Sequence, residues 1–225
     1  MKKKPLIIVI GAYGSGKSEY AINLAWQFKN TEKGKVSLAD LDIINPFFRS
    51  RDLRSYFLQE QIEVVAPEEA YANADLPIIT PAIKGAIEDQ NKIVILDCGG
   101  DPAGCRVLGL FIDSILVRGY EMHFVVNTNR PFTSTVEEII TMKQMLEKSS
   151  GLQINEIVCN TNLMQFTTVD VVTDGLLILH QVAEKENLIL RKYLVFREWY
   201  DDYPLYIHGV QKVSLDYFLR KPWEK

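Results

Sequence analysis

The chain has 225 residues, of which 47% are hydrophobic and 24% are charged, with a formal net charge of -4. This balance is that of an ordinary soluble globular protein, and the slight negative charge excludes a general attraction to nucleic acid or to a membrane surface. No apolar stretch reaches the roughly 18 residues that a membrane-spanning helix needs, so we expect no transmembrane segment and no nucleic-acid partner.

Three cysteines, Cys98, Cys105 and Cys159, are odd in number and form no C-x-x-C pair. This pattern favours a reducing compartment over a disulfide framework. The first apolar run, residues 6–10, is too short for the core of a signal peptide. We therefore predict a cytoplasmic protein.

Apolar runs of strand length alternate with helical patterns, which is typical of a parallel sheet with helices on both faces. We predict an α/β fold: a three-layer α/β/α arrangement around a mostly parallel sheet of about seven strands, in one domain spanning residues 1–225. The expected strands are residues 5–10, 35–39, 62–65, 92–96, 121–126, 154–158 and 190–196. The expected helices are residues 17–29, 81–91, 134–149 and 168–187, with an irregular stretch after Asp42, a loop at 67–80 and an unassigned tail at 198–225.

Residues 11–18, GAYGSGKS, match the phosphate-loop pattern G-x-x-x-x-G-K-[ST] between a predicted strand and a predicted helix. Glycines there let backbone N–H groups surround a β-phosphate, and the helix N-terminus adds the positive end of its dipole. Lys17 is spaced to reach the β- and γ-phosphates, and the Ser18 hydroxyl to bind Mg²⁺. The expected nucleotide contacts are Gly11, Ala12, Gly14, Ser15, Gly16, Lys17, Ser18 and Glu19.

Acidic residues follow two of the predicted strands. Asp97, in KIVILDCGG, stands where a carboxylate can hold Mg²⁺ through its water shell, and Gly99-Gly100 permit a mobile loop beside it. Its alternative role is to cap the next helix. Asp40 and Asp42 end the strand at 35–39, and Asp42 is the candidate for orienting an attacking water, with a turn-capping role as the alternative.

The segment IINPFFRSRD, residues 43–52, follows Asp42 directly. Arg49 and Arg51 are placed to approach phosphates or an acidic partner. The adjacent Phe47 and Phe48 are packing residues, or belong to a switch segment that reorders with the nucleotide state.

Together, GAYGSGKS, ADLDIINP, ILDCGGDPAG and IVCNTN resemble the SIMIBI class of P-loop NTPases, particularly its ParA/MinD/CobQ-type nucleotide-binding domains. The resemblance spans about residues 5–165. It implies that Asp42 supports hydrolysis together with Lys17, that Asp97 is the switch II acid, and that Ser18, Asp42 and Asp97 serve Mg²⁺. It also implies that Asn160 contacts the base, with Asn127 or Asn162 as alternatives.

One departure from this pattern lies in the phosphate loop itself. The ParA/MinD pattern has a signature lysine five residues before Lys17 that reaches across a dimer, and this chain has Ala12 there. A nucleotide-sandwich dimer with activation in trans is therefore not expected by inheritance, and Arg49 and Arg51 are the substitute cations that the sequence offers.

The stretch DCGGDPAGC also resembles the switch of the nitrogenase iron protein, which precedes a cluster-binding cysteine. Cys105 falls one residue beyond the spacing of that cysteine. We expect Cys98 and Cys105 to be buried thiols, with a cluster or metal ligand as the alternative.

The base is predicted from the two asparagine triplets, residues 127–129 and 160–162. GTPases of this class usually read guanine with Asn-Lys-x-Asp, and neither triplet is followed by the acid. We therefore expect ATP with Mg²⁺ as the bound cofactor.

Three functions are compatible with these motifs. The favoured one is a Mg²⁺-dependent ATPase acting as a nucleotide-dependent switch for a protein partner or homodimer, or for loading a metal or cofactor. The alternatives are a small-molecule kinase or ATP-dependent ligase, and a non-hydrolysing binding module for which Asp42 would be dispensable.

Overall fold

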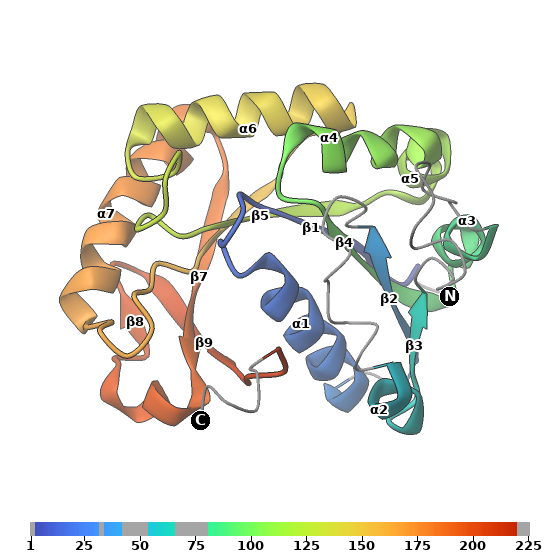
Figure 1. Cartoon of the computed structure of the whole chain (residues 1–225), viewed down its shortest axis with the longest axis horizontal. Helices are drawn as coiled ribbons and strands as arrows, with labels where there is room; N and C mark the ends of the chain where they lie inside the picture. The colour runs from blue at the N-terminus through green and yellow to red at the C-terminus, as the bar shows by residue number, and fades with distance from the viewer. Residues whose placement is uncertain (1–2, 32–33, 42–53, 66–80, 220–225) are drawn as a thin grey trace.

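The computed structural model describes residues 3–31, 34–41, 54–65 and 81–219, and their strands form one sheet in the order β3-β2-β4-β1-β5-β6-β7-β9-β8 (Figure 1). Every pairing in it is parallel except that of β8 with β9. The strands are β1 (Leu6–Ile10), β2 (Lys35–Leu41), β3 (Ile62–Val65), β4 (Lys92–Cys98), β5 (Glu121–Val126), β6 (Glu156–Cys159), β7 (Ile189–Phe196), β8 (Tyr206–Ile207) and β9 (Val210–Leu215).

Helices cover both faces of the sheet, as the predicted three-layer α/β/α arrangement requires. One face carries α1 and α2, and the other carries α3 to α7 (Figure 1). The helices are α1 (Lys17–Thr31), α2 (Arg54–Gln59), α3 (Pro81–Glu88), α4 (Pro102–Cys105), α5 (Ile112–Arg118), α6 (Val136–Ser150) and α7 (Val169–Glu186), with 3-10 turns η2 (Arg106–Phe111) and η3 (Arg197–Asp202).

Strand β1 shows why the sheet lies in the middle of the molecule. All five of its residues, LIIVI, are buried. Leu6, Ile8 and Ile10 pack into the core beneath α3 to α7, whereas Ile7 and Val9 pack into the core beneath α1 and α2. Because strand side chains alternate between faces, a strand that is apolar at every position must be covered on both sides.

The predicted mostly parallel α/β fold is confirmed, and strands 62–65 and 121–126 begin and end as expected. Two differences come from the C-terminal tail, which supplies β8 and β9 and raises the strand count to nine. Apolar and polar residues alternate only weakly in this tail. Its strands form through pairing, β9 with β7 and β8 with β9. The predicted loop at 67–80 lies outside the described residues.

Short helices were missed in two places, at α2 and at residues 102–118 (α4, η2 and α5). The second has a start signal in the sequence, since Asp101 is an N-cap whose carboxylate accepts from Gly104 N, followed by Pro102 in the first turn. β2 and β4 also each run two residues further than expected, so Asp40 and Asp97 lie within strands.

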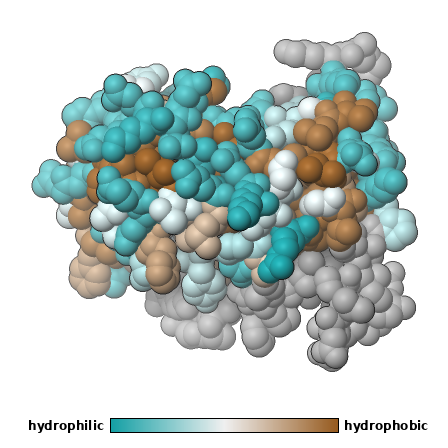
Figure 2. All heavy atoms as spheres, turned by 90° about the horizontal axis from the view of Figure 1, so that it is seen from above, coloured by the Kyte–Doolittle hydropathy of each residue, from teal (hydrophilic) through white to brown (hydrophobic). Residues whose placement is uncertain are grey.

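Helix α6 and the segment from α4 to α5 present a mixed surface. Figure 2 looks onto this face and shows hydrophobic areas between hydrophilic ones. Exposed apolar side chains on these elements and on the loop before α6 are Leu110, Leu116, Val117, Phe132 and Met145.

Arg118, at the end of α5, joins three chain segments on the amino side of the sheet. Its guanidinium is buried and donates to the carbonyls of Ala86, Ile87 and Asp89 after α3, and to those of Lys4, Pro5 and Lys92 before β1 and β4. The last carbonyls of a helix have no partner inside it. A single cation therefore donates to six carbonyls, of which those of Pro5 and Asp89 also accept from backbone N–H groups.

We expect Arg118→Met to lower the free energy of unfolding by about 3 kcal/mol or more, because hydrogen bonds from a charged donor are lost and buried carbonyls are left unpaired. Arg118→Lys should recover only part of this loss, since a point ammonium cannot reproduce the planar fork. Urea unfolding measures both, with exposed Arg106→Met as the matched control. An Arg118→Met variant as stable as Arg106→Met would refute the assignment.

Candidate functional site

The loop between β1 and α1 has the backbone shape of a phosphate-binding loop. Gly14 and Gly16 have φ angles of +75° and +83°, values that side-chain-bearing residues rarely adopt. The N–H of Ser15 bonds back to Ala12 O at 3.0 Å, and the N–H of Tyr20 to Gly16 O at 3.0 Å, which starts the helix. The N–H groups before this first bond are left for a ligand at the positive end of α1.

Neighbouring strand ends press directly on this loop. A Cβ on Gly11 would lie 2.5 Å from Val125 O, and one on Gly100 would lie 2.9 Å from Tyr13 N. The segment after β4 thus touches the loop backbone. It continues into α4, where a Cβ on Gly104 would lie 2.7 Å from Gly99 Cα, so a shift at Gly99 must be passed on to α4.

Two buried carboxylates lie side by side near the loop. Asp40 on β2 and Asp97 on β4 are register partners, 1% and 0% exposed. By strand alternation both share the face of Ile93 and Ile95, which is the face that α1 covers. The acid beside Asp97 in the described structure is therefore Asp40. Asp42, predicted for catalysis and Mg²⁺, lies outside the described residues, as do Arg49 and Arg51.

Of the other predicted contacts, Lys17 is 7% exposed, Ser15 and Ala12 are buried, and Ser18 is partly buried. Ser15 Oγ is buried without a hydrogen-bond partner among the described residues. Taken together, the glycine cradle, this orphaned hydroxyl, the Lys17 ammonium and the Asp40–Asp97 pair fit the phosphates of a nucleotide with Mg²⁺.

Glu19, predicted among the nucleotide contacts, binds the C-terminal segment. Its carboxylate accepts from the backbone N–H groups of Phe218 and Leu219. Burial raises the pKa of Glu19 to about 7, although these two hydrogen bonds act in the opposite direction. Asn23, one turn later, exchanges hydrogen bonds with Asp216. The first two turns of α1 therefore bind residues 216–219.

Asn160, predicted to contact the base, contacts the phosphate loop. Its amide donates to Ser15 O at 2.6 Å, and a Cβ on Gly16 would lie 2.2 Å from its Nδ2. The alternatives for base contact, Asn127 and Asn162, bond to each other: Asn127 donates to Asn162 O at 3.0 Å and accepts from Asn162 N at 3.2 Å. Base contact by any of the three stays a prediction.

Arg130 is a site residue that sequence reasoning missed. It is exposed, in the loop after β5, and a Cβ on Gly14 would lie 3.4 Å from its Nε. Nothing in the sequence spacing indicates this approach, since 116 positions separate the two residues and only the pairing of β1 with β5 brings them together. Arg130 therefore puts a cation beside the exposed part of the loop.

The three cysteines form no disulfide and are buried: Cys98, Cys105 and Cys159 are each 0% exposed. Cys105 Sγ donates to Gly99 O at 3.4 Å, which places this thiol in the turn after β4. This arrangement fits the expected buried thiols.

Known structures share this fold at low sequence identity. Chloroplast FtsY from Physcomitrella patens matches with a TM-score of 0.59 and 15% identity over 86% of this chain and 59% of that one. Cell division protein FtsY from Thermotoga maritima matches with 0.60 and 17% over 86% and 62%. FtsY from Mycoplasma mycoides matches with 0.54 and 15% over 84% and 59%.

This chain thus spans about three fifths of the length of those structures. No protein-family model matches it, and a comparison with curated proteins finds no significant match. The structural likeness shows the fold of these FtsY structures, which is the fold that the resemblance to SIMIBI-class P-loop NTPases predicts. Among the described helices, none combines the length and the apolar character that crossing a bilayer demands.

We expect Asn160→Ala to weaken binding of ATP and of inorganic triphosphate by the same factor, about 10-fold, because one hydrogen bond bracing the loop is lost. Calorimetry on both ligands measures the ratio, with exposed Asn129→Ala as the control. If ATP alone lost affinity, Asn160 would be a base contact and the bracing role would be wrong.

Glu19 makes stability depend on pH. Its folded pKa of about 7 lies above its ordinary value of 4.5, so its stabilising contribution is complete below that ordinary value and is lost as the pH rises through the folded one. We expect Glu19→Gln, which imitates the protonated acid, to match the wild type near pH 4.5 and to exceed it by about 1–3 kcal/mol near pH 8.

Urea unfolding across this range measures the difference, and Glu184→Gln on the exposed face of α7 is the control. A gap between Glu19→Gln and wild type that does not change with pH would contradict the assignment.

Proposed function

We propose that this protein is a nucleotide-dependent switch: a Mg²⁺-dependent P-loop ATPase of the cytoplasm whose nucleotide state is sensed by a protein partner or by a second copy of the chain. The observation that carries the proposal is the contact of Gly100 with Tyr13, by which the segment after β4 lies on the phosphate loop. A γ-phosphate that displaced this segment would move α4.

Packing beyond the site supports this role. Asp101 caps α4, Cys105 ties it back to Gly99, and α4 packs on α6. Exposed apolar side chains lie on this face (Figure 2): Met145 on α6, Phe132 before it, and Leu110, Leu116 and Val117 on η2 and α5, which follow α4. Apolar groups at such positions suit a surface that a partner covers.

Within the site, Lys17 serves the β- and γ-phosphates and Ser18 serves Mg²⁺, with Asp97 holding its water shell. Asp42 remains our proposal for orienting the attacking water, and Asp40 is the second candidate because it adjoins Asp97. Arg130 is our proposal for the cation that replaces the signature lysine absent at Ala12, since it already lies beside Gly14.

ATP is the proposed nucleotide because neither asparagine triplet is followed by an acid for guanine. GTP is the alternative, since the fold likeness is to FtsY, a GTPase. The test therefore uses both nucleotides.

Phosphate release by the purified protein, with ATP and with GTP, tests the proposal. We expect slow basal turnover, on the order of one per minute or less as for unstimulated P-loop switches, and stimulation by a macromolecular fraction of cell extract. Lys17→Ala should abolish nucleotide binding in calorimetry, while Lys29→Ala on the same helix should not.

Stimulation by a dialysable fraction alone would favour a small-molecule kinase instead. Nucleotide binding without any hydrolysis would favour a non-hydrolysing module. Tight nucleotide binding by Lys17→Ala would overturn the site itself.

A further inference from the structure

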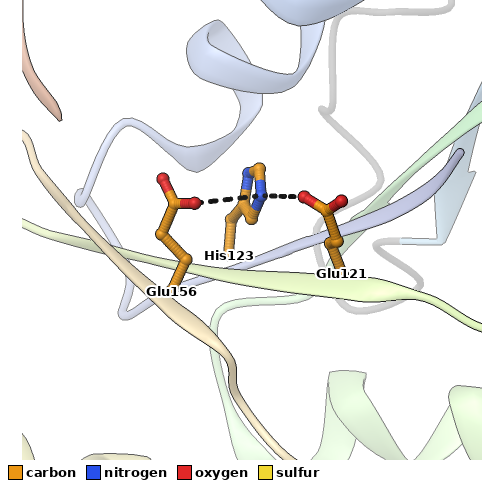
Figure 3. A group of neighbouring side chains, drawn as sticks. All are labelled: Glu121, His123 and Glu156. Carbon is orange, nitrogen blue, oxygen red and sulfur yellow. Dashed lines mark ion pairs between the residues drawn. The ribbon is translucent and has the colours of Figure 1, made fainter. Parts of the chain in front are cut away.

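A second polar group lies under α1, away from the phosphate loop. Figure 3 shows Glu121 and His123 of β5 and Glu156 of β6 with their side chains turned toward one another. Their ligand atoms all lie within 4.8 Å of one another. His123 and Glu156 are register partners, and Val9 separates His123 from Asp97 in the same register across the sheet. The group is therefore two strands from Asp97, about 10 Å.

The imidazole is held in place from its other side. Its Nδ1 lies 3.0 Å from the Tyr20 hydroxyl, and this hydroxyl also accepts a hydrogen bond from Lys192 Nζ at 3.1 Å. In the tautomer that carries its proton on Nδ1, the two lone pairs of the phenol oxygen accept from both Lys192 and Nδ1–H. That tautomer leaves a lone pair on Nε2, and a bonded second nitrogen of this kind orients histidines that bind metals.

Nε2 faces two carboxylates at ion-pair distance rather than at hydrogen-bond distance. It lies 3.6 Å from Glu121 Oε2 and 3.9 Å from Glu156 Oε2, it is buried, and it has no hydrogen-bond partner among the described residues. Hydrogen bonds from nitrogen to oxygen span about 2.7–3.2 Å. The two gaps are thus too long for a proton on Nε2 to close.

A metal ion placed between Nε2 and the two carboxylates would bridge both gaps. Zinc binds nitrogen and carboxylate oxygen at about 2.0–2.2 Å, so two ligand atoms of a tetrahedral site lie about 3.4 Å apart. The two gaps from Nε2 exceed this by a few tenths of an ångström, and the two carboxylate oxygens, which lie within 4.8 Å of each other, would close the rest by rotation of the exposed Glu121 side chain. Lys192 occupies only the other oxygen of Glu156, at 2.8 Å from Oε1, and leaves Oε2 directed at the imidazole.

We propose that Glu121, His123 and Glu156 bind a divalent transition-metal ion such as Zn²⁺, with a fourth position open to water. One imidazole and two carboxylates suit zinc and its neighbours better than Mg²⁺, which prefers oxygen alone. The side chain of Glu121 is 64% exposed and gives the ion a way in, while that of His123 is 3% exposed. Through Tyr20, the ion would hold β5 and β6 to the helix that begins at Lys17.

Titration of the full-length, nucleotide-free protein with Co²⁺, followed by visible absorption, tests the site. We expect one ion per chain, a spectrum of nitrogen and oxygen ligation, and displacement by Zn²⁺. Glu121→Gln and His123→Gln should each weaken binding by at least 10-fold. Glu184→Gln, the same change at an exposed position on α7, should bind as the wild type does.

Thermal unfolding is the second readout, because His123 is buried and its variant could lose stability on its own account. Zn²⁺ should raise the melting temperature of the wild type and of Glu184→Gln but not that of Glu121→Gln. Sulfur-to-cobalt charge-transfer bands would assign the ion to cysteines, and binding that required nucleotide would assign it to the phosphate loop. Either result, or wild-type affinity in Glu121→Gln, would overturn the proposal.

Discussion

The phosphate loop of this protein has no space for side chains on its inner side, and the rest of the site is arranged by that constraint. Cβ atoms at Gly11, Gly16 and Gly100 would meet Val125 O, Asn160 Nδ2 and Tyr13 N within van der Waals distance. The ends of β4, β5 and β6 therefore all pack against one short turn of backbone. Because the contacts at Gly11 and Gly100 are with backbone atoms, the position of the loop and the positions of the strand ends determine one another.

Helix α1 begins at this loop, so the same contacts fix its position, and the helix in turn contacts other parts of the molecule. It binds residues 216–219 through Glu19 and Asn23, and covers two polar pairs of the sheet, Asp40 with Asp97 and His123 with Glu156, which Val9 separates. Tyr20 connects the helix to the second pair through His123. Buried polar groups keep a fixed arrangement only while their partners stay in place. A change in nucleotide state that shifted α1 would thus affect the polar side chains from β2 to β6.

Sequence reasoning succeeded where the signal is local. The GAYGSGKS loop, the all-apolar strand β1 and the alternating strands and helices follow from neighbouring residues alone. It could not find the contacts that distant segments make with a side chain. Glu19 looks like part of the loop motif, but residues 218 and 219 occupy it. Arg130 gives no motif at all, and the pairing of Asp40 with Asp97 depends on strand register, which spacing along the chain does not contain.

Arg118 has a consequence for the order in which the protein forms. Its carbonyl partners lie at residues 4–5 and 86–92, up to 114 positions earlier in the chain. During synthesis, the strands that surround the phosphate loop are complete up to β4 before this guanidinium leaves the ribosome, so these carbonyls lack its hydrogen bonds until then. Long-range contacts of this kind form late because closing a long loop costs chain entropy. The N-terminal half therefore gains these hydrogen bonds only when α5 packs against it.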